Sequence, residues 1–353
     1  MDMKRDYYED VAIFTSRWII FWFCALILGL ALFPFIADKF LKTYYVYVAN
    51  CIAVNIIVAM GLNLLVGYTG QISLGHAGFF AIGAYATIVF MAKLGLPFVV
   101  SLFLAASLSA LFGFLLGLPA LRLEGPYLSI ATLGFGLTVT QIIGRVEYFG
   151  GRQGLHAPEL VIGPLHLDSD ISRYYLFVLI AVLVCLFARN LVKTKVGRAF
   201  IAIRDADIAA ETMGVNLTLY KTLAFAVSAF LAGLAGGLYA FILGYIEPEI
   251  FNMLMSIMFL AMVVVGGLGS IFGAIAGAVL LTWLDLTLRN ILEVPFLGEW
   301  LKVMSRSWFS ITGVSNIQYI VFGSIMVLIM MFEPLGIYGL WLRMKKYWKT
   351  WPF

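Results

Sequence analysis

Polar side chains and glycines interrupt two of the long apolar runs of this chain, and they are its best candidates for lining a polar lumen. The first interruption lies within residues 61–85 and the second within residues 118–140. Polar groups at membrane depth are tolerated only against protein or a water-filled cavity, so both segments are candidates for a pathway across a membrane. The residues singled out as pathway-lining candidates are Gln71, Ser73, His76, Thr132, Gly134 and Gly136.

Each of these residue types also has a structural interpretation. A lone histidine near a span end, such as His76, is commonly hydrogen-bonded within the protein, and a threonine can bond a carbonyl of its own helix. We expect Gly134 and Gly136 to interrupt one span midway, and Pro119 and Pro126 to end one helix and start the next. Close helix packing is the first interpretation of two sets of glycines: Gly75, Gly78 and Gly83, and Gly269, Gly273 and Gly277.

A third polar region is the long segment from Lys193 to Lys221, which separates two apolar runs. Asp205 can cap a helix, Asp207 lies in the first turn, and Gly214 follows the last helical residue. These signals predict a short helix at about 206–213. A structured polar segment between spans predicts a docking element for a partner at the cytoplasmic surface.

The composition is that of a membrane protein, since 63% of the 353 residues are hydrophobic and only 12% are charged. Soluble domains carry about 25% charged residues. Several apolar runs reach the roughly 20 residues that a helix needs to cross a bilayer. We therefore expect an all-α integral membrane protein with about ten transmembrane helices. The expected spans are 18–37, 45–66, 75–92, 98–118, 126–144, 174–190, 222–245, 254–270, 271–288 and 318–340.

The basic residues predict the orientation of the chain. With the segment 191–221 in the cytoplasm, both termini lie there too, and most Lys and Arg residues fall on that side, as the positive-inside rule requires. The segments 145–173 and 289–317 then become outer loops, the first ordered by turns and the second interfacial. We expect one membrane domain over 1–353.

No energy source or reaction centre is visible in the sequence. It has no phosphate-binding loop and no Gly-Lys pair, and its three cysteines lie apart within apolar runs, away from any metal-ligand spacing. Charges within the spans are nearly absent; Asp285 is the main exception, and a helix-end pair with Arg289 explains it. We therefore expect no catalytic residue, metal or cofactor. An ATPase that docks on the cytoplasmic loop is the economical source of energy.

Four stretches resemble the inner-membrane permeases of branched-chain amino acid ABC importers, in particular the larger of their two paired permease types. The stretches are GYTGQISLGHAGFFAIGAYA at 67–86, RLEGPYLSIATLGFG at 122–136, GRAFIAIRDADIAAETMGVNLTLYKTLAF at 197–225 and FEPLGIYGLWLRMKKYWKTWPF at 332–353. The third is similar to the coupling loop of that family. The resemblance implies that an ATP-binding subunit is contacted there, and the residues so implied are Arg204, Asp205, Ala209, Ala210, Glu211 and Gly214.

The resemblance also implies partners and a location. These are a homologous second permease, two ATP-binding subunits, a periplasmic solute-binding protein and the bacterial inner membrane. One departure, Arg152-Gln153, lies in an outer stretch where relatives usually carry a small polar residue or proline. Importers for urea, amides, other amino acids or sugars remain alternatives, as do a stand-alone channel or secondary carrier and a structural membrane protein.

Overall fold

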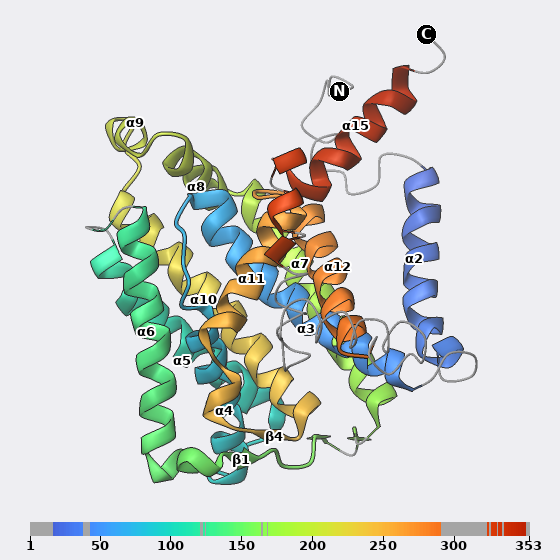
Figure 1. Ribbon diagram of the computed structural model, residues 1–353, viewed down its shortest axis with the longest axis vertical. Helices are drawn as coiled ribbons and strands as arrows, with labels where there is room; N and C mark the ends of the chain where they lie inside the picture. Colours follow the sequence, from blue (N-terminus) through green and yellow to red (C-terminus); the bar gives the residue numbers. More distant parts are fainter. Residues whose placement is uncertain are drawn as a thin grey trace, which may run out of the picture.

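The computed structural model describes residues 17–37, 43–120, 123, 125–163, 165–167, 169–290 and, with gaps, 323–350 (Figure 1). Long helices dominate these residues. The helices are α2 (Arg17–Ile36), α3 (Tyr44–Leu62), α4 (His76–Ala92), α5 (Phe98–Ala120), α6 (Pro126–Arg145), α7 (Asp170–Lys193), α8 (Lys195–Asp205), α9 (Asp207–Thr212), α10 (Leu217–Leu243), α11 (Met253–Gly266), α12 (Ile271–Asn290) and α15 (Gly336–Thr350).

Six helices of the described part of the chain are long and apolar enough to cross a membrane: Tyr44–Gly67, Phe98–Pro119, Pro126–Arg145, Asp170–Lys193, Leu217–Leu243 and Ile271–Leu288. Two shorter apolar helices, α4 and α11, accompany them. The chain is a multi-pass helical membrane protein. The first nine expected spans overlap helices of the structure. The tenth, 318–340, is described with gaps from residue 323 onward; residues 323–324, 326–329 and 331–332 are helical, and α15 begins near its end.

Helix α10 lies at the centre of the bundle and packs against α3, α4 and α5 (Figure 1). Glycines bring its backbone close to its neighbours. A Cβ atom built on Gly83 of α4 would stand 1.9 Å from the carbonyl oxygen of Gly233, and one on Gly236 would stand 1.9 Å from that of Phe80. The packing interpretation of Gly83 is confirmed, because no larger residue fits at this separation.

Helices α11 and α12 form a second glycine contact. A Cβ on Gly277 would stand 1.9 Å from the carbonyl oxygen of Met262, and one on Gly273 would stand 2.6 Å from that of Gly266. Gly269 does not share this role: it lies in the turn between the two helices, with a φ of +72°. The expected stripe therefore holds for two of its three members.

The connection between α3 and α4 is irregular, as the glycine content of this stretch predicts. Helix α3 continues into a π-helical segment, η2 (Asn63–Gly67), and one further helical pair, Tyr68 and Thr69; residues 70–75 are then irregular until α4 begins at His76. Gly70 takes a φ of +72°, in the left-handed region that favours glycine. The predicted break at the entry to α4 is thus present.

Turns and short strands order the segment between α6 and α7. It contains the 3-10 turns η3 (Glu147–Phe149) and η4 (Gly151–Gln153) and the strands β1 (Leu155–His156), β2 (Val161–Ile162) and β3 (Leu165–His166). Strand β1 pairs with β4 (Tyr245–Ile246), which follows α10 and precedes the turn η5 (Pro248–Ile250). The expected outer segment 289–317 lies outside the described residues after Asn290.

Helix α15 projects from the same end of the bundle as α8 and α9 (Figure 1). Its start is held by an ion pair of 2.8 Å between Arg343 and the buried carboxylate of Glu333. Beyond that pair, residues 341–348 are exposed, and they combine aromatic with basic side chains.

Candidate functional site

Helices α8 and α9 form a corner at the end of the bundle. Helix α8 buries Gly197, Ala199, Phe200 and Ile203, which recur at the three- and four-residue intervals of one helix face. Helix α9 ends at Thr212, two residues before the predicted terminator Gly214, which takes a φ of +86°. The predicted short helix at 206–213 is observed as Asp207–Thr212.

The predicted cap of this helix is wrong. Ala206 occupies the N-cap position, and its methyl group cannot accept a hydrogen bond. The Asp207 carboxylate accepts a hydrogen bond of 2.8 Å from the Ile208 amide. Asp205 is instead the last residue of α8, and it pairs with the neighbouring Arg204 at 2.9 Å. A cation beside the carboxylate competes with backbone amides for it, and the charged pair is the stronger bond.

The outer face of α9 is exposed and partly apolar. The side chains of Ile208 and Met213 are 76% and 85% exposed. Of the residues that the family resemblance assigns to ATPase contact, Ala209, Glu211 and Gly214 lie on the exposed surface, whereas Ala210 is buried. The sequence interpretation missed Ile208 and Met213, although two apolar residues in a polar loop were a visible signal.

Arg204 faces the opposite way, toward the membrane helices. Its Nη1 donates a hydrogen bond of 3.0 Å to the carbonyl oxygen of Gly67, the last residue of the π-helical segment. Guanidinium atoms also lie close to the turn between α11 and α12, since a Cβ on Gly269 would be 3.0 Å from Nη1. Arg204 therefore touches both the π-helical segment and the α11–α12 turn.

Asn63 links the same two elements from inside. Its Oδ1 accepts a hydrogen bond of 2.9 Å from the Gly269 amide, and its Nδ2 donates one of 3.1 Å to the carbonyl oxygen of Ser270. We call the five residues Asn63, Gly67, Arg204, Gly269 and Ser270 the Arg204 junction. The junction connects the α8–α9 corner to η2 at the end of α3 and, through Asn63, connects η2 to the turn between α11 and α12.

The predicted pathway candidates Ser73 and His76 are completely buried. The His76 ring lies 3.1 Å from the Ser73 hydroxyl through Nδ1 and 2.7 Å from the Ser228 hydroxyl through Nε2. Both ring nitrogens thus have partners, and Ser228 belongs to α10. In this conformation His76 ties the entry of α4 to α10, which is the structural interpretation of a buried histidine.

The candidates on α6 are distributed around that helix. The Thr132 hydroxyl accepts a hydrogen bond of 3.0 Å from the Leu74 amide and donates one of 2.9 Å to the carbonyl oxygen of Ser129. Gly136 packs against Gly78 of α4, while Gly134 is exposed with open space beside it. Helix α6 runs without a break from Pro126 to Arg145, so the expected interruption at Gly134 and Gly136 is wrong. Neighbouring α4 supplies the close contact that explains Gly136.

Gln71 is set apart from the other candidates. It is only 7% exposed, and within the part of the chain that the structure describes neither its Oε1 nor its Nε2 has a hydrogen-bond partner. It lines a cavity of about 300 Å³ beside Arg204. The structure thus brings Gln71 together with Arg204 and Asp205, and it separates these three from the buried His76 and Thr132.

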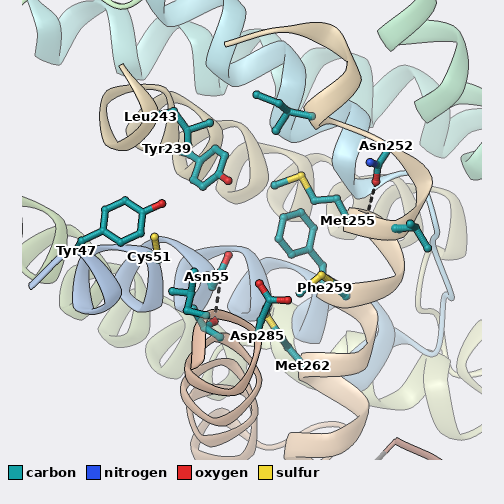
Figure 2. A pocket seen from close by; sticks show the side chains of 15 residues that line it. Tyr47, Cys51, Asn55, Tyr239, Leu243, Asn252, Met255, Phe259, Met262 and Asp285 are labelled. Atoms are coloured by element: carbon teal, nitrogen blue, oxygen red, sulfur yellow. Dashed lines mark hydrogen bonds between the residues drawn. The ribbon is translucent and has the colours of Figure 1, made fainter. Parts of the chain in front are cut away.

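A larger cavity of about 370 Å³ lies between α3, α10, α11 and α12 (Figure 2). Asn55 and Asp285 point into it from neighbouring helices, and Asn55 Nδ2 donates a hydrogen bond of 2.8 Å to the Thr282 hydroxyl. The opposite wall on α11 carries apolar side chains. The cavity residues labelled in Figure 2 are Tyr47, Cys51, Asn55, Tyr239, Leu243, Asn252, Met255, Phe259, Met262 and Asp285.

The sequence interpretation did not place a cavity here, although it marked Asp285 as the main charge within a span. Its expected partner, Arg289, has a side chain outside the described part of the structure. Carboxylates within the spans of membrane proteins are rare, and they usually face the bundle interior or a cavity. Carboxylate, amide and hydroxyl groups opposite methionine and phenylalanine suit a ligand with one cationic and one apolar end.

Comparison with known proteins places this architecture. The family described as branched-chain amino acid transport system / permease component matches residues 44–330. The high-affinity branched-chain amino acid transport system permease proteins LivM of Salmonella typhimurium and Escherichia coli are 35% and 33% identical; the alignments cover 82% and 92% of this chain and 69% and 75% of those proteins.

The probable permease LivH of Methanocaldococcus jannaschii is 28% identical over 63% of this chain and 73% of its own length. No solved structure matches. Both the extent of the family match and the identity to the two LivM proteins are sufficient to assign the chain. It belongs to the branched-chain amino acid transport system permease family.

Proposed function

We propose that this chain is a membrane-spanning permease subunit of an ATP-driven ABC importer for leucine, isoleucine and valine. A homologous permease completes the membrane domain, two ATP-binding subunits supply the energy, and a periplasmic binding protein delivers the solute. The chain lies in the bacterial inner membrane with about ten spans and both termini in the cytoplasm, and it holds no cofactor of its own. Similarity to both LivM and LivH proteins supports a paired permease, and their names support the substrate class.

The observation that carries the proposal is the two-sided construction of the α8–α9 corner. One side presents two large apolar side chains, Ile208 and Met213, to the surroundings. On the other side, the Arg204 guanidinium contacts the end of the π-helical segment. An element with an apolar face for binding a partner and a charged contact to the membrane helices is suited to transmit a movement of the partner to those helices.

The path of that force follows from the hydrogen bonds. A displacement of α9 moves the end of α8, and the Arg204 guanidinium then pulls on the Gly67 carbonyl. Asn63 carries the movement to the α11–α12 turn, because its side-chain amide forms hydrogen bonds with Gly269 and Ser270 of that turn. Irregular π-helical backbone is easier to rearrange than a regular helix, so η2 is a natural place for the helices to change their relative tilt.

The larger cavity is then the place where this subunit contacts the solute. The Asp285 carboxylate suits the ammonium group of an amino acid, and Asn55 offers amide hydrogen bonds beside it. Methionine side chains on α11 adapt to branched apolar shapes because they are unbranched and flexible. Selection among aliphatic amino acids by such a wall is weak, which leaves specificity to the binding protein.

Co-purification tests the proposal. Affinity purification of this chain in mild detergent should bring down an ATP-binding subunit and a second permease. The variants Ile208→Asp and Glu211→Lys should lose the ATP-binding subunit but keep the second permease, because only the outer face of α9 is altered. Glu159→Lys is the matched control, since Glu159 is also exposed but lies between β1 and β2. Purification of the wild-type chain without either partner would contradict the proposal.

The alternatives give different outcomes in uptake experiments. A stand-alone channel or secondary carrier moves solute in vesicles that lack any ATPase. An importer for urea, amides or another amino acid requires the ATPase but is not inhibited by excess leucine. A structural protein leaves uptake unchanged when the Arg204 junction is disrupted.

A further inference from the structure

The smaller cavity lies where the α3–α4 link, the start of α6, the α8–α9 corner and α10 meet. Its volume is about 300 Å³, and polar groups make up most of its wall. Its lining includes Gln71, the charged residues Arg204, Asp205, Asp207 and Lys221, and several aliphatic side chains. The cavity is separate from the larger one, whose lining comes from α3, α10, α11 and α12 and shares no residue with it.

Gln71 gives the first indication that this cavity takes a ligand. Its side chain is more than nine-tenths buried, and both amide atoms lack a partner among the residues that the structure describes. Buried polar groups in native proteins are almost always hydrogen-bonded, because an unpaired one loses its hydration without compensation. An amide offers a donor and an acceptor together, so it suits a ligand that also carries both.

The charges around the cavity give the second indication. Arg204 pairs with Asp205 at 2.9 Å, and Lys221 pairs with Asp207 at 3.5 Å. Two cations and two anions therefore border one small space. A phosphate would be repelled by the two aspartates and a simple cation by the two bases, whereas a zwitterion can satisfy both signs at once.

The remaining wall is aliphatic. It consists of Ile72, Leu123, Leu128 and Ile203. Leu128 and Ile203 are nearly inaccessible to solvent, while Ile72 is exposed at the rim. An apolar wall opposite paired charges fits an α-amino acid with an aliphatic side chain better than a glycine-like or charged one.

We propose that this cavity is a second amino-acid site, on the cytoplasmic side, which binds released aliphatic amino acid and thereby slows import. The proposal rests on the function proposed above. The carboxylate of the ligand competes with Asp205 for the Arg204 guanidinium, and its ammonium group takes the freed aspartate. Arg204 also holds the Gly67 carbonyl, so a ligand here favours one state of the Arg204 junction and is linked to the transport cycle.

Proteoliposomes that contain the complete importer test this site. The initial rate of ATP-driven uptake of labelled leucine is measured with and without unlabelled leucine on the side of the ATP-binding subunits, with lysine as the control compound. The wild-type importer should slow by about fivefold or more with leucine and not with lysine. Gln71→Leu should remove most of this inhibition, measured as the ratio of the uptake rates with and without leucine on the side of the ATP-binding subunits. Gln141→Leu is the matched control, because Gln141 is an exposed glutamine of α6 that lines neither cavity.

A second variant keeps the test informative if Gln71→Leu fails to assemble. Ile72→Asp places a third carboxylate at the exposed rim and should also relieve the inhibition, because it repels the ligand carboxylate. If the wild-type uptake rate is the same with and without leucine on the side of the ATP-binding subunits, the second site is overturned and the proposed function still stands. Equal inhibition of the wild type and both variants would have the same consequence. Absence of any ATP-driven leucine uptake by the wild type would instead remove the proposed function itself.

Discussion

The helix bundle around α10 and the α8–α9 corner are held by opposite kinds of contact. In the bundle, glycines bring backbone against backbone, as at Gly83 and Gly233, and this packing leaves no room for change. At the corner, a few hydrogen bonds from Arg204 and Asn63 connect elements that otherwise expose polar and apolar surface. The close packing around α10 makes the bundle a rigid body, whereas the few hydrogen bonds at the α8–α9 corner make it a joint. The bundle therefore moves as a unit, and the corner transmits motion to it.

The largest expected effect comes from filling the glycine contact in the bundle. Gly83→Ala should destabilise the protein by about 3 kcal/mol or more, because its Cβ would overlap the Gly233 carbonyl, which is backbone and cannot swing aside. The thermal unfolding midpoint in detergent measures it. Gly134→Ala, at a position with open space, is the matched control and should change little. Equal behaviour of the two variants would contradict the rigid-body assignment.

Removal of the Asn63 amide comes next. Asn63→Leu leaves the Gly269 amide and the Ser270 carbonyl without their side-chain partner in a buried site, which should cost about 1–3 kcal/mol of unfolding free energy. Because these bonds join η2 to the α11–α12 turn, uptake should fall more than stability alone explains. Uptake that follows the amount of folded protein would show that Asn63 is only structural.

Arg204→Met should have a smaller effect on stability and a specific one on coupling. We expect leucine uptake to fall about tenfold, the consequence of one lost charged hydrogen bond to Gly67, while the ATP-binding subunit stays bound. Arg198→Met is the control on the same helix, because Arg198 is exposed as well but is not the arginine that bonds the Gly67 carbonyl. ATP hydrolysis and uptake measured together check the prediction, and loss of ATPase binding in Arg204→Met would place Arg204 at the partner interface instead.

The smallest effect is expected at α15. Arg343→Lys keeps a cation beside the buried Glu333 carboxylate and changes only the largely exposed side of the pair, so it should cost about 0–1 kcal/mol. The unfolding midpoint and the uptake rate should both stay close to wild type. A large loss of uptake would extend the joint from the α8–α9 corner to the C-terminal helix.

Local signals in the sequence were sufficient for the helices and for the position of α9. The chain turns away from α9 through a left-handed backbone conformation at Gly214. Glycine adopts this conformation most readily, so the residue type itself indicates the helix end. The cap was mispredicted because the neighbouring Arg204 pairs with the Asp205 carboxylate. Whether a carboxylate caps a helix or pairs with a cation depends on the three-dimensional positions of both groups.

The cavities could not be predicted in the same way. The larger one brings Asn55 beside Thr282 and Asp285, which both lie more than two hundred residues after it in the sequence. Such a contact depends on how the helices cross. Likewise, polar residues at 71–76 were treated alike in the sequence, yet packing buries His76 against Ser228 and places the buried Gln71 in the wall of a cavity. Residue type indicates that a polar group needs a partner, and only the fold decides whether protein or ligand provides it.

Uptake of labelled leucine by proteoliposomes, with and without the ATP-binding subunits, tests the central claim most directly. The wild-type chain with its second permease, both ATP-binding subunits, binding protein and ATP should accumulate leucine against its gradient. Omission of the ATP-binding subunits, or the Ile208→Asp change that removes their docking face, should abolish accumulation. Leucine accumulation or flux that persists at the wild-type rate without these subunits would contradict the claim that this chain is driven through α9.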